Sequence, residues 1–154
     1  IGTRPLMSNQ RLYFAYGRNM HLPTMTERCP AATYVGRGRL YEHRIMINSR
    51  GVSTVVPDEL RIVHGVLWDL TTACEEALDV VEGLARGHYT KDSAHVELDG
   101  AGREHAMIYV AADVAPGPPK PGYLEDLIEA ANEHGFPLSY VRHLESLFSP
   151  AGRG

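Results

Sequence analysis

Glu82 is the side chain in this sequence that is best placed for acid–base chemistry. It ends a helical pattern and is followed by Gly83 and Gly87, which favour a tight turn because glycine adopts positive φ without steric cost. Tyr89 then opens a strand pattern. A carboxylate on a rigid helix end can accept a proton and return it. A glutamate before a glycine is more often a solvated helix terminus, so this chemistry needs support from other residues.

A loop from Tyr16 to Met20 could supply hydrogen-bond donors. An apolar strand pattern precedes it, and Gly17 and Asn19 both tolerate unusual backbone angles. A strand that runs into a glycine-containing loop before a helix exposes successive backbone N–H groups, which can bind a carboxylate or an oxyanion. On this motif alone, a plain strand-to-helix turn is an equally good interpretation.

Tyrosines and histidines are abundant, with eight of each. The tyrosines together could line a narrow polar pocket, although a single tyrosine is more often half-buried and structural. No two histidines have the spacing of metal ligands on one helix face, so we predict no metal site. The usual nucleophile, phosphate-loop, dinucleotide and zinc motifs do not occur either.

The composition is that of an ordinary globular protein. The chain has 154 residues, of which 44% are hydrophobic and 22% charged, with a net charge of −4. Basic residues are scattered, and no apolar run approaches the roughly 20 residues that span a bilayer. We therefore expect neither a nucleic-acid partner nor a membrane partner. Cys29 and Cys74 are far apart and are expected to be free thiols, with a single disulfide left open.

We predict one domain over residues 7–148. Met7 is expected to be the native start, with residues 1–6 as an expression remnant or a disordered N-terminus, and residues 149–154 are expected to fray. Residues 1–6 lack the apolar segment of a signal peptide, so a cytoplasmic location is expected. A homodimer is left open.

The elements that must position these residues are mostly strands, followed by helices. Apolar and β-branched patterns predict strands over 11–16, 33–39, 41–47, 53–56, 61–70, 89–98 and 104–111. Helical spacing predicts helices over 22–28, from 71 or 72 to 82, 123–134 and 137–148. We expect Pro57 to end the strand before it, and the prolines of 116–121 to form an extended loop. The predicted class is α+β, with a small, strongly curved mixed sheet or barrel.

Two segments resemble the γ-glutamylcyclotransferase family. Residues 13–20, Tyr-Phe-Ala-Tyr-Gly-Arg-Asn-Met, are similar to its YFxYGSNM motif, and residues 78–89 are similar to its LDxxEGxxxGxY segment. Shorter similarities follow in the same order at 36–40, 62–68, 118–121 and 135–140. The resemblance covers nearly all of residues 11–148, and several motifs in matching order are far more specific than one.

The resemblance implies a small mixed barrel with flanking helices. It implies release of 5-oxoproline from a small-molecule γ-glutamyl substrate, without metal or cofactor, and Glu82 as the acid/base. The backbone of residues 17–19 would hold the glutamyl carboxylate or the oxyanion. The substrate-binding residues that it implies are Tyr16, Gly17, Arg18, Asn19, Met20, Tyr89, Tyr109 and Tyr140.

Arg18 departs from the family motif, which usually has serine there. The backbone N–H donors of the loop are unaffected by this change, but the small serine side chain is replaced by a long, charged one. We expect Arg18 either to point to solvent or to reach into the pocket and pair with a second carboxylate of the substrate.

Two other interpretations stay open. The same pocket could carry out a related amide-cleaving or lyase step on a specialised biosynthetic intermediate. The chain could also be a non-enzymatic binding member of the fold, which the presence of Glu82 argues against.

Overall fold

The computed structural model describes residues 11–148, and the expectations for residues 1–6 and 149–154 lie outside this range. Five strands of the described chain close into a barrel in the order β1-β3-β2-β4-β5. Their bounds are β1 Arg11–Ala15, β2 Thr33–Ile47, β3 Ser53–Leu70, β4 Tyr89–Leu98 and β5 Gly102–Ala111. β1 is parallel to β5, and the other neighbouring strands are antiparallel. The barrel is therefore mixed, as predicted.

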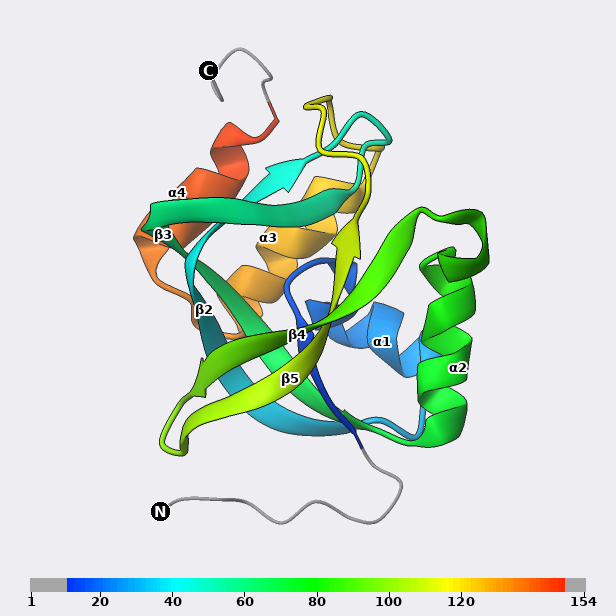
Figure 1. Ribbon diagram of the computed structural model, residues 1–154. Coiled ribbons are helices and arrows are strands. Elements are labelled where there is room, and N and C mark those ends of the chain that lie inside the picture. Colours follow the sequence, from blue (N-terminus) through cyan, green and yellow to red (C-terminus); the bar gives the residue numbers. More distant parts are fainter. Residues whose placement is uncertain (1–10, 149–154) are drawn as a thin grey trace.

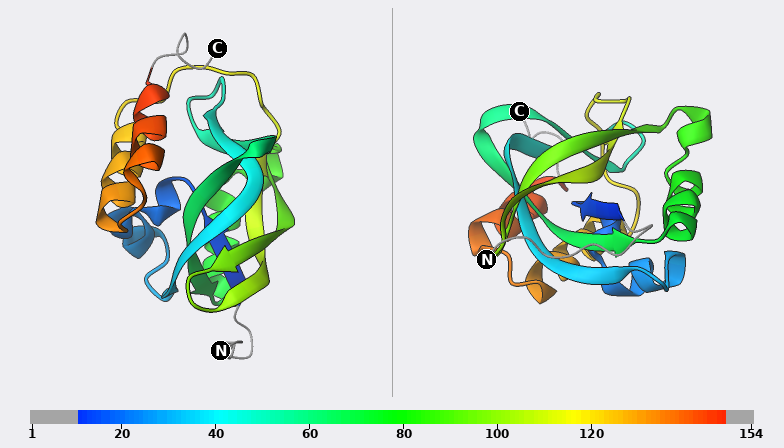
Figure 2. Two further views of the ribbon diagram at one scale, coloured as in Figure 1. Left: turned by 90° about the vertical axis from the view of Figure 1, so that its left-hand side faces the viewer. Right: turned by 60° about the horizontal axis from the view of Figure 1, so that its bottom comes forward.

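Helices flank the barrel on separate sides (Figures 1 and 2). Four are α-helices, namely α1 Leu22–Arg28, α2 Thr72–Val81, α3 Tyr123–Glu133 and α4 Leu138–Ser146. Two are single 3₁₀ turns, η1 Arg18–Met20 and η2 Leu84–Arg86. α3 and α4 pack against each other, whereas α1 and α2 lie together elsewhere on the barrel. In the described chain, no helix has the length and the apolar content to cross a membrane.

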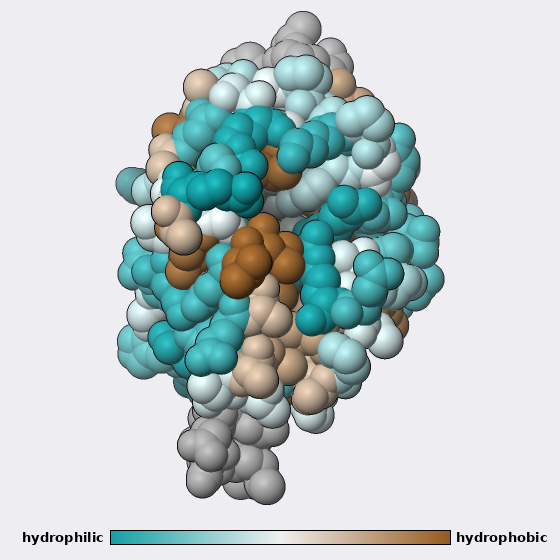
Figure 3. Space-filling view, turned by 90° about the vertical axis from the view of Figure 1, so that its right-hand side faces the viewer, coloured by the Kyte–Doolittle hydropathy of each residue, from teal (hydrophilic) through white to brown (hydrophobic). Residues whose placement is uncertain are grey.

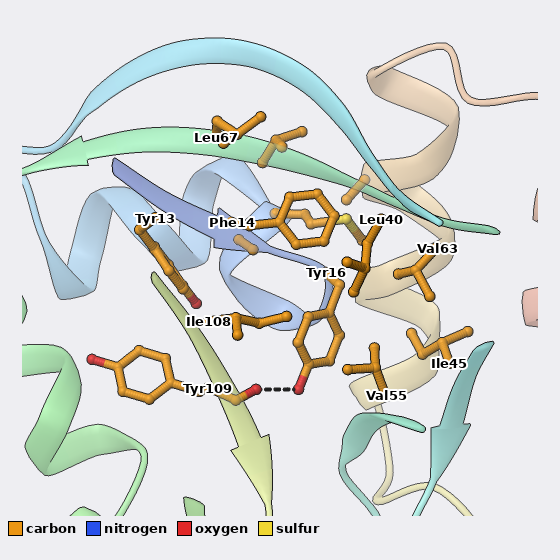
Figure 4. Packing of buried hydrophobic residues seen from close by; sticks show 14 of the residues in the cluster. Tyr13, Phe14, Tyr16, Leu40, Ile45, Val55, Val63, Leu67, Ile108 and Tyr109 are labelled. Atoms are coloured by element: carbon orange, nitrogen blue, oxygen red, sulfur yellow. Dashed lines mark hydrogen bonds between the residues drawn. The ribbon is translucent and has the colours of Figure 1, made fainter. Parts of the chain in front are cut away.

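Apolar side chains from several strands fill the barrel (Figure 4). Phe14 of β1, Ile45 of β2, Leu67 of β3 and Ile108 of β5 are all almost fully buried. Gly65 of β3 makes room for them, since a Cβ there would lie 2.5 Å from the carbonyl oxygen of Ala15 and 2.6 Å from the ring of Phe14. Burial of these side chains is the main source of stability in such a core.

The strand predictions were wrong at Pro57. One long strand, β3, replaces the two strands expected over 53–56 and 61–70, and β2 likewise merges the two expected over 33–39 and 41–47. Pro57 does interrupt the pairing: His43 lies opposite Pro57 and Tyr41 lies opposite Ile62, so residues 58–61 face only Glu42. Glu42 has a positive φ of 61° at this irregularity. The proline therefore bends a strand that continues, because a bulge accommodates its missing N–H.

The other elements agree with the sequence to within one or two residues. Thr71 caps α2, and its hydroxyl accepts a hydrogen bond of 3.1 Å from the Cys74 N–H. Cys29 and Cys74 are both buried, free thiols.

Candidate active site

The end of α2 carries Glu82. Its N–H still donates to Leu78 O at 2.8 Å, so the residue is held in the last helical turn. Gly83 and Gly87 follow with φ of 68° and 73°, the left-handed region predicted for them. His88 N–H then donates back to Gly83 O at 3.1 Å, which closes the turn.

Asn19 connects Glu82 to the barrel. Its Nδ2 lies 3.0 Å from the Tyr13 hydroxyl oxygen and 3.5 Å from Glu82 Oε2. Its Oδ1 accepts a 2.8 Å hydrogen bond from Arg28 Nη1, and its backbone oxygen accepts one of 3.1 Å from Trp68 Nε1. Asn19 is 3% exposed. Its amide is therefore fixed with one N–H directed to the carboxylate.

The pKa of Glu82 is raised above the ordinary value of a glutamate. Burial is the main cause, because it penalises the charged carboxylate. The positive charges of Arg28 and Arg50 and the hydrogen bond from Asn19 oppose this shift without cancelling it. A carboxylate with a raised pKa can both take and return a proton near neutral pH.

α2 is tied to the barrel by a second contact. The Tyr109 hydroxyl donates to Asp79 Oδ1 at 2.7 Å, and Lys91 Nζ lies 3.0 Å from Asp79 Oδ2. Lys91 also lies 2.5 Å from Glu75 Oε2. These contacts join α2 to β4 and β5, which fixes the helix that carries Glu82.

Tyrosine hydroxyls form a wall near Glu82. Tyr16 donates to Tyr109 O at 2.6 Å, as the dashed line in Figure 4 shows, and Tyr89 donates to Ser53 O at 2.5 Å. The Tyr123 hydroxyl lies 2.8 Å from Ser53 Oγ. Burial raises the pKa of each of these four tyrosines. The wall is therefore neutral at physiological pH, and Glu82 is the one carboxylate among the described residues that line the cavity beside it.

A cavity of about 170 Å³ opens beside Glu82 and this wall. The structure brings to it most of the residues that the sequence singled out. These are Tyr16, Gly17, Arg18, Asn19, Glu82, Tyr89 and Tyr109.

The loop from Gly17 to Met20 forms one side of the cavity. A Cβ at Gly17 would lie 2.6 Å from Ser53 Oγ and 3.1 Å from the Tyr123 hydroxyl, so a side chain does not fit there. The first hydrogen bond of the turn runs from Met20 N–H to Gly17 O at 3.0 Å. The N–H groups of residues 17–19 precede it, so they have no acceptor within the turn.

Met20 and Tyr140 are not among the lining residues. Met20 is fully buried in the core. Tyr140 lies on α4, where its ring packs against His64 with centroids 4.8 Å apart. It borders a different hollow, together with Arg44 and His143. Substrate contact by Tyr140 at this cavity was therefore a wrong expectation, because α4 covers another side of the barrel (Figure 2).

Arg18 lines the cavity and is partly exposed, so its orientation lies between the two that were expected. Its Nε and Nη2 both lie 2.8 Å from Asp126 Oδ2 on α3, and its guanidinium carbon lies 5.8 Å from the centre of the Tyr123 ring. The side chain thus follows the cavity wall toward α3. Its charge is neutralised by this chain's own carboxylate.

His21, Asp126 and Glu129 form the one group of potential metal ligands among the described residues, with ligand atoms within 4.8 Å of one another. Arg18 already supplies a positive charge to Asp126. His21 Nε2 lies 3.1 Å from Glu129 Oε2. Asp126 and Glu129 therefore each have a partner within the protein, Arg18 and His21 respectively.

The sequence did not single out several other lining residues. Tyr13 stood within a quoted motif, and the tyrosine count was the only signal for Tyr123. The basic residues at the cavity are Arg28, Arg50, Arg86 and Lys120, with His88 beside them. They come from four separate segments, and no local pattern shows that these segments meet.

Known proteins are similar to this chain in sequence and in fold. Two curated proteins called gamma-glutamylcyclotransferase are similar to this chain, from Bos taurus at 26% identity and from Homo sapiens at 27%. Each alignment spans 146 residues, 88% of this chain and 78% of the relative.

Solved structures share the fold. One called gamma-glutamyl cyclotransferase matches with a TM-score of 0.82 at 26% identity, covering 88% of this chain and 86% of the other. YkqA from Bacillus subtilis matches with a TM-score of 0.74 at 21% identity, covering 91% of this chain and 56% of its own, a likeness of fold alone. The family model described as the AIG2-like family matches residues 62–144, more than half of this chain. The matched residues run from within β3 through α2 and Glu82 into α4. The chain therefore belongs to the AIG2-like family.

Proposed function

We propose that this protein cleaves a γ-glutamyl amide by intramolecular cyclisation, releasing 5-oxoproline and a free amine. The observation that carries this proposal is Glu82, a carboxylate of raised pKa that Asn19 holds beside a cavity lined by neutral tyrosines. The relatives named gamma-glutamylcyclotransferase support the same reaction class.

The nucleophile in this reaction is the α-amine of the substrate. It is an ammonium at neutral pH and must lose a proton before it can attack the γ-carbonyl carbon. Glu82 takes that proton, and the new C–N bond closes a five-membered ring. Because both reacting groups belong to one molecule, the step has the entropic advantage of an intramolecular reaction. The chain then needs no serine or cysteine nucleophile.

The second step breaks the original amide bond. Glu82 gives its proton to the leaving nitrogen as the C–N bond breaks, so that a neutral amine departs and the carboxylate is regenerated. The ring nitrogen loses its remaining extra proton to solvent, which leaves the neutral lactam of 5-oxoproline. In this proposal, the N–H groups of residues 17–19 hold the substrate carboxylate or the oxyanion that forms during attack. Arg28 and Arg50 oppose positive charge in the cavity, which favours the neutral, nucleophilic form of the amine.

A substrate panel with a Glu82 variant tests this proposal. The protein is incubated with γ-glutamyl amino acids, glutathione and γ-glutamyl amines, and 5-oxoproline is measured by mass spectrometry. Glu82→Gln keeps the shape of the side chain but cannot take the proton, so we expect the rate to fall by about 10²–10⁴-fold. The circular dichroism spectrum should not change.

Tyr140→Phe is the matched control. It removes one polar atom from a side chain outside the cavity, so it should keep the parent rate. A fully active Glu82→Gln protein would remove Glu82 from the mechanism. If neither parent nor control released 5-oxoproline from any substrate, a related amide-cleaving step or a binding role would take the place of this proposal.

A further inference from the structure

The cavity is far more basic than the molecule that contains it. The chain has a net charge of −4, yet the cavity lining holds five lysine and arginine side chains and one carboxylate, Glu82. Arg18 is neutralised by Asp126, and Arg28 is hydrogen-bonded to Asn19. The side chains of Arg50, Arg86 and Lys120 have neither kind of contact with residues 11–148, and we call these three the mouth cations.

The mouth cations come from three segments that meet at the opening. Arg50 lies in the loop after β2, Arg86 in η2 and Lys120 in the proline-rich loop before α3. The loops touch, since Lys120 N–H donates to Gly51 O at 2.9 Å. His88 lies among all three: its pKa is lowered, first by desolvation and then by the charges of Arg50, Arg86 and Lys120.

Several other basic side chains of this protein have acidic partners, although Arg61, Arg103 and Arg142 form no ion pair with a described residue. Arg37 and Arg39 share Asp99, Lys91 contacts Glu75 and Asp79, and Arg44 lies 3.5 Å from Asp58. Among the described residues, no carboxylate forms an ion pair with any mouth cation. Arg50 acts on Glu82 and Asp113 only through the longer-range field of its charge. Positive charges that converge without a direct ion pair repel one another, and an anionic ligand relieves this repulsion. The opening is therefore built to receive negative charge from outside the chain.

The position of the mouth cations relative to Glu82 indicates that they face the leaving amine of the substrate. The proposed reaction places the γ-carbonyl at Glu82 and the glutamyl group against the wall of residues 17–19. The leaving amine then extends toward solvent, where the mouth cations lie. Figure 3 shows a hollow on this face with hydrophilic side chains around much of its rim.

We propose that the leaving amine is an acidic amino acid with two carboxylates, recognised by Arg50, Arg86 and Lys120. This inference rests on the function proposed above and specifies its substrate class. The mouth cations bind the two carboxylates of the leaving group, and Glu82 protonates its nitrogen. They act as specificity-determining residues, because a leaving group without a carboxylate gains no binding energy from them.

Three substrates that differ only in the leaving group test the proposal. γ-Glutamylglutamate, γ-glutamylalanine and γ-glutamylethylamide release amines with two, one and no carboxylates. We expect kcat/KM to rise with each added carboxylate. Raising the salt concentration should reduce this preference, because exposed charges are screened.

Replacement of the mouth cations should reduce the same preference. Arg86→Gln is expected to lower the ratio of kcat/KM for γ-glutamylglutamate to that for γ-glutamylethylamide by about 2–5-fold, the usual worth of an exposed ion pair. The triple variant Arg50→Gln, Arg86→Gln, Lys120→Gln should lower the ratio about tenfold or more. Using a ratio cancels any change in the pKa of Glu82, which both substrates share.

Arg61→Gln is the control, since Arg61 is exposed, borders a different hollow and loses the same charge. It should leave the ratio unchanged. Equal kcat/KM for the three substrates, or a triple variant with the parent ratio, would overturn the assignment while the cyclotransferase function stood. Absence of 5-oxoproline from all three would instead contradict the proposed function, and the inference with it.

Discussion

Asn19 helps to set the state of the Glu82 carboxylate, because its amide contacts both Glu82 and Tyr13 of the barrel. Its amide donates to Glu82 and Tyr13 and accepts from Arg28. Burial raises the pKa of Glu82, and these polar neighbours limit the rise. The site thus balances desolvation against charge to hold a carboxylate ready for proton transfer.

This balance predicts how activity depends on pH. Glu82 must be ionised to accept a proton, so kcat/KM should fall as the pH drops through its raised pKa. Arg28→Gln removes a nearby positive charge that lowers this pKa, so the pKa should rise further and the acid limb should move to higher pH. The measurement is kcat/KM from pH 4 to 8 for the parent and the variant. An acid limb that stayed in place, or moved to lower pH, would show that Arg28 does not act on Glu82.

At the residue scale, the sequence identifies what is local. Glu82 and the loop of residues 17–19 could be singled out because a short motif contains each one. The partner of Arg18 could not, since Asp126 lies 108 positions away on another helix. Tyr140 was misplaced for a related reason: a tyrosine pattern does not tell which side of a barrel its helix will cover.

At the scale of elements, α2 and the turn after it set the position of Glu82. The Thr71 cap fixes the start of the helix, and Asp79 ties its side to Tyr109 and Lys91. Gly83 then turns the chain directly behind the carboxylate. A substitution in this turn should therefore lower both the unfolding free energy and kcat.

Gly83 and Gly87 allow a paired test of this turn. Both have positive φ, so alanine at either position should cost about 1–2 kcal/mol of backbone strain. At Gly83 a Cβ would also lie 2.7 Å from the ring of His88, whereas at Gly87 it would meet open space. Gly83→Ala should thus lower the unfolding free energy more than Gly87→Ala and reduce kcat, as urea titration and steady-state kinetics would show. Equal effects from the two variants would contradict this account.

Helices and hairpins were predictable because their signals lie within a few residues of one another. Thr71, the helical apolar spacing after it, and the glycines that follow are enough to define α2. The continuity of β3 was not predictable, because it depends on the partner strand. β2 provides the bulge at Glu42 that lets β3 pass through Pro57, and nothing near Pro57 signals this.

At the scale of the whole molecule, barrel closure brings together the parts of the site. β1 pairs in parallel with β5, which places Tyr13 beside Met107 although 94 positions separate them. The loop after β1 and the tyrosine of β5 thereby reach the same cavity. The curved mixed sheet could be predicted from the strand pattern and the family resemblance. The cluster of Arg50, Arg86 and Lys120 could not, because it exists only once the barrel has closed.

Gly65 lies where β1 and β3 pack too closely for a side chain. A Cβ there would lie 2.5 Å from Ala15 O, so Gly65→Ala should push β1 away from β3 and cost roughly 1–3 kcal/mol or more. Gly100→Ala in the β4–β5 turn meets open space and should cost only the strain of its positive φ. Thermal unfolding of both variants makes the comparison. A Gly65→Ala protein as stable as the parent would show that the strands can separate without cost.

The measurement that tests the central claim most directly is whether oxygen from water enters the product at the γ-carbonyl carbon. The reaction is run in ¹⁸O-labelled water with γ-glutamylglutamate, and the ¹⁸O content of each product is determined by mass spectrometry. Cyclisation by the substrate's own amine predicts 5-oxoproline without ¹⁸O, formed by the parent and hardly at all by Glu82→Gln. Glutamate that carries ¹⁸O in its γ-carboxylate would mean attack by water, and would contradict the account.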